Sequence, residues 1–166
     1  CICGFLQPSA GTVHVDGKQI GVEVDFPPDI GIIIESPGFL PQLSGLKNLE
    51  ILAGLKRKIG LKEVADTIRQ VGLDPLSAKP VGKYSLGMRQ RLGIAQAIME
   101  RPSLLILDEP MNGLDKYGVA EMRALFRSLA TDGRTILLAS HNIQDIEELC
   151  DTVCEMDAGV MTMVKE

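Results

Sequence analysis

The chain has 166 residues, of which 45% are apolar, and its formal net charge is −5 at neutral pH. This length and composition are typical of one globular domain with a sizeable core, and they exclude a disordered chain. The acidic balance gives no electrostatic footprint for a polyanion, so we expect no nucleic-acid partner. Apolar runs such as 30–34 and 104–107 are far too short to cross a bilayer, which predicts a soluble chain.

Residues 12–20 alternate between apolar and polar around Asp16-Gly17, which predicts a β-hairpin with a two-residue turn. The same stretch imitates a phosphate-binding loop, because Gly11 precedes Gly17-Lys18. Five residues separate the two glycines instead of four, however, and Gln19 stands where Ser or Thr must bind magnesium. The hairpin therefore explains these residues.

The four cysteines form two short pairs near the ends of the sequence, Cys1 with Cys3 and Cys150 with Cys154. A four-thiolate metal site is one interpretation, but neither pair has the usual two-residue gap. We expect four reduced cysteines, buried as small hydrophobic residues.

The middle of the chain changes from strand to helix patterns. Residues 30–34 read as a buried strand after Pro27-Pro28, and residues 44–72 read as two helices, each ended by a glycine. Ser85 is then expected to cap a third helix that ends before Pro102. These helices predict a helical insertion at about 40–100, between core segments 1–39 and 101–166.

The last part alternates strictly between strands and helices. We predict a strand at 104–108, a helix at about 116–130, a strand at 135–140, a helix at about 142–150 and a hairpin around 157–159. This order predicts an α/β fold with a parallel sheet and crossover helices. Functional groups should lie at the carboxyl ends of the strands, where Asp108, Glu109 and His141 fall.

Two places carry residues suited to phosphoryl transfer. Asp108 and Glu109 follow a buried strand, where one acid can serve Mg²⁺ and the other can orient or deprotonate a water. Ser85-Leu86-Gly87 combines a hydroxyl, a glycine that permits close approach and the free N–H groups of a helix start. An exposed strand end and an ordinary helix cap explain each place by itself, and the ordered set favours a nucleotide site.

The ordered set resembles one family, the nucleotide-binding subunits of ATP-binding cassette (ABC) transporters. Residues 84–90, Tyr-Ser-Leu-Gly-Met-Arg-Gln, resemble the family's signature, and residues 104–110 resemble its Walker B strand. Residues 112–115 resemble the D-loop, and Ser140-His141 resembles the switch histidine. The fold implied is a P-loop NTPase-like parallel sheet with a helical signature insertion and an N-terminal β-hairpin.

The resemblance implies that ATP is sandwiched in a head-to-tail dimer, homomeric or heteromeric, which works with a transmembrane permease at the inner face of the cell membrane. It implies that Asp108 serves Mg²⁺, that Glu109 polarises the hydrolytic water and that His141 contacts the γ-phosphate. It also implies that residues of the signature contact the nucleotide of the partner subunit and that Asp115 helps communication between the two sites. The signature residues concerned are Ser85, Leu86, Gly87, Met88 and Gln90.

The sequence departs from the family pattern in three ways. No Walker A loop is present, so we expect an N-terminally incomplete domain that by itself binds ATP weakly and does not hydrolyse it. Glu35 stands where most members carry the Q-loop glutamine; it serves as a further Mg²⁺ ligand or points to solvent. Leu86 and Met88 replace small or polar signature residues, while Ser85 and Gly87 keep the hydroxyl and the close approach.

The sequences at residues 35–37 and 140–147 resemble those of the exporter branch of bacitracin-type and ABC-2 systems. The leading hypothesis is therefore the ATPase subunit of an exporter. The alternative is a non-hydrolysing module that supplies only its signature face to a partner. A chromosome-type ABC ATPase is disfavoured, because the 50 residues between Glu35 and Ser85 leave no room for coiled-coil arms. A translation factor is disfavoured, because no second cassette is visible.

Overall fold

The computed structural model describes residues 1–34 and 37–165. Glu35, one of the predicted site residues, lies outside the described residues. The chain divides into two compact units, Cys1–Ile30 and Gly31–Glu166, and each is described by itself.

The first unit contains the predicted hairpin, with β1 (His14–Val15) and β2 (Lys18–Gln19) paired antiparallel and His14 opposite Gln19. Asp16 and Gly17 have φ values of 50° and 75°. Positive φ at both central residues is what a type I′ turn requires. The hairpin prediction is confirmed, since Gly17 lies in the turn and Lys18 begins β2.

The second unit is built on a three-stranded sheet in the order β3-β4-β5, formed by β3 (Ile30–Ile33), β4 (Leu104–Asp108) and β5 (Thr135–Ala139). β4 and β5 run parallel, with Leu104 opposite Thr135 and Asp108 opposite Ala139. The predicted α/β fold with parallel pairing is confirmed. The carboxyl ends of β4 and β5 therefore lie side by side.

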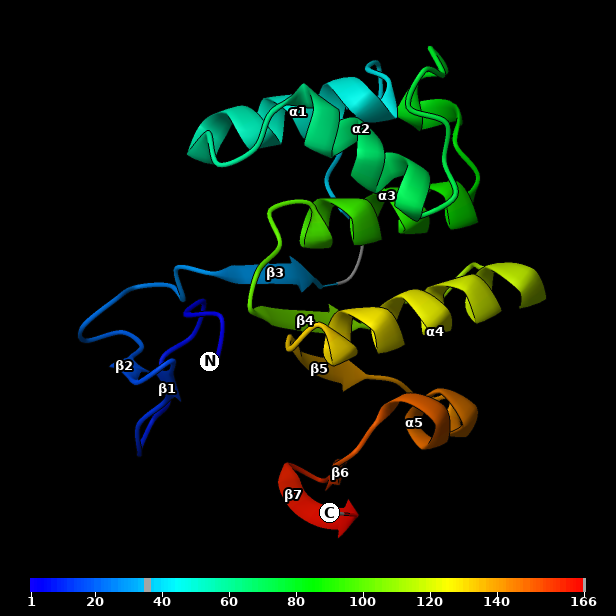
Figure 1. Cartoon of the computed structure of the whole chain (residues 1–166). Coiled ribbons are helices and arrows are strands. Elements are labelled where there is room, and N and C mark those ends of the chain that lie inside the picture. The colour runs from blue at the N-terminus through cyan, green and yellow to red at the C-terminus, as the bar shows by residue number, and fades with distance from the viewer. Residues whose placement is uncertain (35–36, 166) are drawn as a thin grey trace. The chain divides into compact units, whose positions relative to one another are not determined.

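Five α-helices lie within the described residues of this unit (Figure 1). They are α1 (Gly45–Lys56), α2 (Leu61–Gln70), α3 (Leu86–Ile98), α4 (Lys116–Thr131) and α5 (Ile143–Leu149), with a 3₁₀ turn at Val81–Lys83.

The prediction that a glycine ends each of the first two helices is half right. Gly72 follows α2 with a φ of 77°, but α1 ends at Arg57, which adopts a φ of 55° and donates its N–H to the Ala53 carbonyl at 2.9 Å. Gly60 instead precedes α2 as its N-cap. A left-handed helix end is commonest for glycine, and the sequence pattern does not reveal an arginine in that role.

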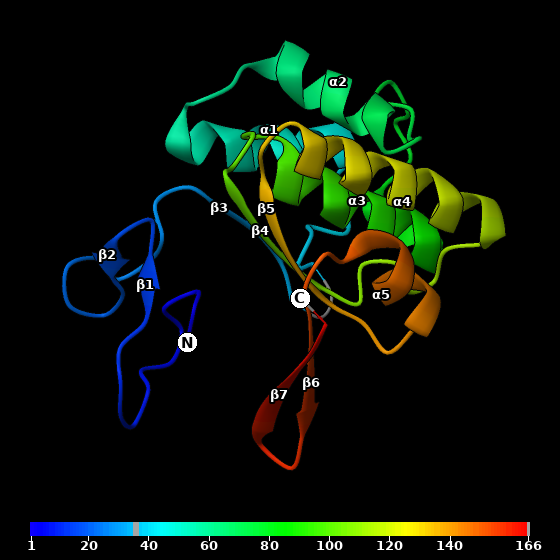
Figure 2. The ribbon, with the colours of Figure 1, turned by 60° about the horizontal axis from the view of Figure 1, so that its bottom comes forward.

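One face of the sheet carries the core. Leu105 and Leu107 of β4 are fully buried and belong to a cluster with residues from α1 to α4. Figure 2 shows α1, α3 and α4 on one side of the strands. Gly31 of β3 lets α3 approach closely, since a Cβ there would lie 2.0 Å from the Ala97 carbonyl oxygen. On β5, Leu137 alternates with the core-facing Ile136 and Leu138 and is 46% exposed. The helices therefore pack on one side of β4 and β5.

The chain closes with the predicted hairpin, β6 (Val153–Asp157) and β7 (Val160–Lys165). In the described part of the chain, no helix is both long enough and apolar enough to span a bilayer. All four cysteines are free, and Cys1 and Cys154 are exposed. Cys3 and Cys150 are half-buried, so the prediction of four buried thiols is wrong. Cys154 is exposed because both hairpin strands around it are exposed along almost their whole length.

Candidate functional site

Glu109 and His141 meet where β4 and β5 end. The Glu109 Oε1 atom accepts a hydrogen bond from the His141 backbone N–H at 2.8 Å and lies 2.7 Å from the His141 Nδ1 atom. The parallel pairing explains this meeting, because Glu109 directly follows β4 and His141 lies two residues after the end of β5. The imidazole is 79% exposed, whereas the Glu109 side chain is 29% exposed. The carboxylate is thus held in place while the ring stays open to a ligand.

The backbone of Glu109 is also held in an unusual conformation. Its φ is 46°, a left-handed value that is uncommon for a residue with a side chain. Its N–H donates to the Ala139 carbonyl at 2.9 Å, and its carbonyl accepts from the Asn112 N–H at 3.1 Å. Such a conformation persists where surrounding contacts impose it.

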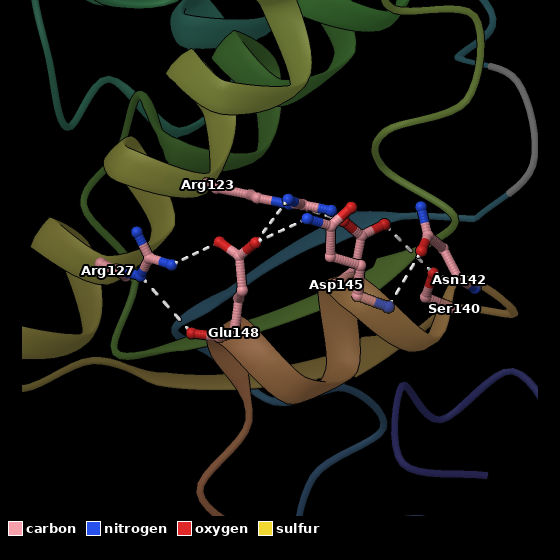
Figure 3. A network of polar contacts seen from close by, with 7 residues as sticks. Arg123, Arg127, Ser140, Asn142, Asp145 and Glu148 are labelled. Atoms are coloured by element: carbon pink, nitrogen blue, oxygen red, sulfur yellow. Dashed lines mark hydrogen bonds and ion pairs between the residues drawn. The ribbon is translucent and has the colours of Figure 1, made fainter. Parts of the chain in front are cut away.

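A buried ion pair fixes the turn that carries His141 (Figure 3). Arg123 of α4 donates from Nε to the Asp145 Oδ1 atom at 2.7 Å, and the two side chains are 9% and 2% exposed. The second carboxylate oxygen of Asp145 lies 3.5 Å from the Ser140 hydroxyl, whose oxygen accepts the Asn142 N–H at 3.1 Å. α5 and the turn before it are therefore anchored to α4.

Glu148 extends this anchor towards solvent. Its carboxylate accepts hydrogen bonds from Arg123 at 2.8 Å and from Arg127 at 2.6 Å, and Gln144 donates to it at 3.1 Å (Figure 3). Two arginines thus balance two carboxylates. Sequence reasoning missed Arg123 and Asp145. The signal was an arginine within the apolar face of α4, between Val119 and Phe126.

The signature segment, residues 84–90, begins α3 as predicted. Ser85 is the N-cap, and its hydroxyl oxygen accepts the Met88 N–H at 3.2 Å. Tyr84 is buried, Ser85 and Leu86 are exposed, and Gly87 and Met88 are half-buried. The exposed start of α3 leaves backbone N–H groups where an anion can be bound.

The first turn of α3 packs closely on residues 109–114. A Cβ on Gly87 would lie 2.8 Å from the Gly113 carbonyl oxygen, and Gly113 itself has a φ of 77° with Leu86 against it. Gln90 is 7% exposed, and its amide donates to the Pro110 carbonyl at 3.0 Å. This amide is bound within the chain, and contact between Gln90 and a nucleotide stays a prediction.

Asp115 starts α4 as its N-cap and accepts the Gly118 N–H at 2.9 Å. It is exposed and ends the segment that packs on the signature. This cap explains Asp115 locally, and its part in communication between sites stays a prediction.

Asp108 ends β4 half-buried, beside Glu109. Over residues 1–34 and 37–165, no three His, Cys, Asp or Glu side chains gather closely enough to hold a metal ion by themselves. Mg²⁺ in nucleotide sites takes one or two carboxylates together with phosphate oxygens and waters. The donor set of Asp108 and Glu109 fits a metal that arrives with a phosphate ligand.

Residues 1–112 match the sequence profile of the ABC transporter family. The chain belongs to the ABC transporter family. It is 40% identical over 158 residues to the uncharacterised ABC transporter ATP-binding protein YybJ of Bacillus subtilis (strain 168). The matched segment covers 95% of this chain and 72% of YybJ.

Two relatives have names that state a cargo. The bacitracin transport ATP-binding protein BcrA of Enterococcus faecalis is 42% identical over 92% of this chain, which spans 50% of BcrA. The lantibiotic transport ATP-binding protein SrtF of Streptococcus pyogenes is 38% identical over 99% of this chain, which spans 71% of SrtF. The chain thus spans between half and three quarters of these relatives.

The fold also matches a solved structure. The dimeric post-hydrolysis state of the ATP-binding cassette MJ0796, bound to ADP and Pi, superposes with a TM-score of 0.83 at 19% identity. The match covers 99% of this chain and 78% of that one. The expected ABC ATPase fold is therefore confirmed.

Proposed function

We propose that this chain is part of the ATP-binding subunit of an ABC exporter of the bacitracin type. The family match and the names of BcrA and SrtF support this function. The observation that carries it is the contact between Glu109 and His141 at the ends of two parallel strands. An ATP-hydrolysing site needs a carboxylate there, oriented towards the attacking water.

In this proposal, Glu109 accepts a hydrogen bond from the water and orients it. The His141 backbone N–H fixes the carboxylate, and the exposed imidazole is free to contact the γ-phosphate. Asp108 would hold Mg²⁺, which would neutralise phosphate charge there, and Glu35 is a further candidate ligand. ATP is the nucleotide, and the signature start at Ser85 and Gly87 serves the nucleotide of a second ATPase subunit.

The same proposal places the protein on the cytoplasmic face of the cell membrane, with a permease as partner. Residues 40–100 are proposed as the signature subdomain that receives the permease. The dimeric state of the MJ0796 cassette is consistent with a second subunit, which the signature requires. The alternative is a non-hydrolysing module that supplies only its signature face, at the exposed start of α3, to a partner.

A pair of histidine variants tests the function. We expect His141→Ala to lower the kcat of ATP hydrolysis by the complete protein about 100-fold, as loss of a positioned proton-transfer or charge-stabilising group does. His14→Ala is the matched control, because His14 is the other histidine and lies in the β1–β2 hairpin. Equal activity of the two variants would contradict the proposal.

A further inference from the structure

The main chain around Glu109 is held by a side chain of α3. Gln90 donates from one amide nitrogen to the Pro110 carbonyl at 3.0 Å and to the Glu109 carbonyl at 3.4 Å. The residue is 7% exposed, so water does not readily replace this donor. The side chain must be a neutral donor, because a carboxylate would face two carbonyl oxygens.

Gln90 stands one helical turn after Gly87, so both residues lie on the same face of α3. That face contacts the segment after β4 at two points, since a Cβ on Gly87 would lie 2.8 Å from the Gly113 carbonyl oxygen. Interfaces packed this closely do not deform continuously. A displacement of the start of α3 must therefore move residues 109–113 as well.

Glu109 is the place where such a displacement has a chemical effect. Its φ of 46° depends on contacts at both ends of the residue, the Ala139 carbonyl on one side and the Gln90 and Asn112 donors on the other. The direction of its carboxylate follows from this backbone. The His141 N–H then fixes one oxygen of the carboxylate at 2.8 Å.

We propose that Gln90 is a positioning residue, which ties the signature start of α3 to the backbone of Glu109. This inference rests on the proposed function, in which Ser85 and Gly87 meet one nucleotide and Glu109 acts on another. Gln90 then transmits a displacement at the first site to the second through its hydrogen bonds to the Glu109 and Pro110 carbonyls. This positioning role requires no contact between Gln90 and either nucleotide.

The test compares Gln90→Met, which keeps the length of the side chain and removes the donor, with Gln96→Met further along α3. Hydrogen exchange is followed in the complete protein at the Asn112 and His141 backbone N–H groups, which donate to Glu109. The Thr135 N–H, which donates to the Ser103 carbonyl at the other end of β5, is the internal reference. We expect exchange to rise about tenfold at Asn112 and His141 in Gln90→Met alone, as for one lost buried hydrogen bond, with Thr135 unchanged.

The same variants are assayed for ATP hydrolysis. Gln90→Met should lower kcat about tenfold and leave the KM for ATP within about twofold, because the residue acts on Glu109 and not on nucleotide binding. Three results for Gln90→Met would each overturn the inference. They are wild-type exchange rates at Asn112 and His141, an equal rise of the exchange rate at Thr135, or a higher KM with unchanged kcat.

A second variant and the exchange data distinguish failure of this inference from a folding defect or from failure of the proposed function. If Gln90→Met does not fold, Gln90→Asn, which keeps the amide on a shorter stem, gives the same comparison. If the wild-type protein hydrolyses no ATP, the proposed function fails, and the exchange rates still decide whether Gln90 holds Glu109.

Discussion

At the scale of the residue, the contact between the signature and the D-loop-like segment is tightly packed. Gly113 combines a φ of 77° with Leu86 at its α-carbon, where a Cβ would lie 2.4 Å from Leu86 Cγ. Gly133 has a φ of 88°, and a Cβ there would meet nothing within 4 Å. Both glycines have a left-handed backbone that would be strained in a residue with a side chain, and they differ in packing.

This difference gives a measurable prediction. Gly133→Ala should cost about 1–2 kcal/mol of unfolding free energy, from left-handed strain alone. Gly113→Ala should cost at least about 1 kcal/mol more, since Leu86 must move as well. Urea unfolding of both variants measures the difference, and equal costs would show that Leu86 does not pack there.

The cysteines differ in reactivity for a physical reason. Burial raises the pKa of the Cys150 thiol, despite the opposing effect of Lys165, so little thiolate forms at neutral pH. Cys154 is exposed. We expect iodoacetamide to modify Cys154 before Cys150 at pH 7, with the gap narrowing as the pH rises. Mass spectrometry of the Cys154→Ser variant gives the rate for Cys150, and faster alkylation of Cys150 would be the contrary result.

At the scale of the element, α5 is attached to α4 mainly by charge. Asp145→Ala should cost about 3–5 kcal/mol, because it leaves the Arg123 guanidinium buried without its partner. Glu148→Gln is the matched control and should cost less than about 1 kcal/mol, since Glu148 is 34% exposed. Denaturant unfolding compares them, and a cost for Asp145→Ala no larger than that of the control would be evidence against a buried ion pair.

The elements themselves follow closely from sequence patterns. The hairpin at Asp16-Gly17, the Ser85 cap and the 104–108 strand are local signals, and the structure contains all three. The meeting of Glu109 and His141 was also within reach, because parallel strands bring their carboxyl ends together. The long-range pairs could not be predicted from the sequence. The residues around Arg123 do not indicate Asp145 as its partner, and those around Gln90 do not indicate the Pro110 carbonyl.

At the scale of the whole molecule, the chain carries two separate sets of predicted site residues. The start of α3 carries the signature, and the ends of β4 and β5 carry Glu109 and His141. We expect residues 1–166 by themselves to release no phosphate from ATP beyond the level of their own Glu109→Gln variant, because they include no phosphate loop. A malachite-green phosphate assay with magnesium measures this, and activity above the variant would refute the expectation.

The most direct test of the account is magnesium-dependent ATP hydrolysis by the complete protein and its Glu109→Gln variant, with Glu147→Gln as the control. Glu147 lies exposed on α5, away from the β4 end in sequence. The account predicts that Glu109→Gln binds ATP and loses at least about 100-fold in kcat, as removal of a catalytic base does, while Glu147→Gln stays at the wild-type rate. Hydrolysis by Glu109→Gln at the rate of the control would contradict it.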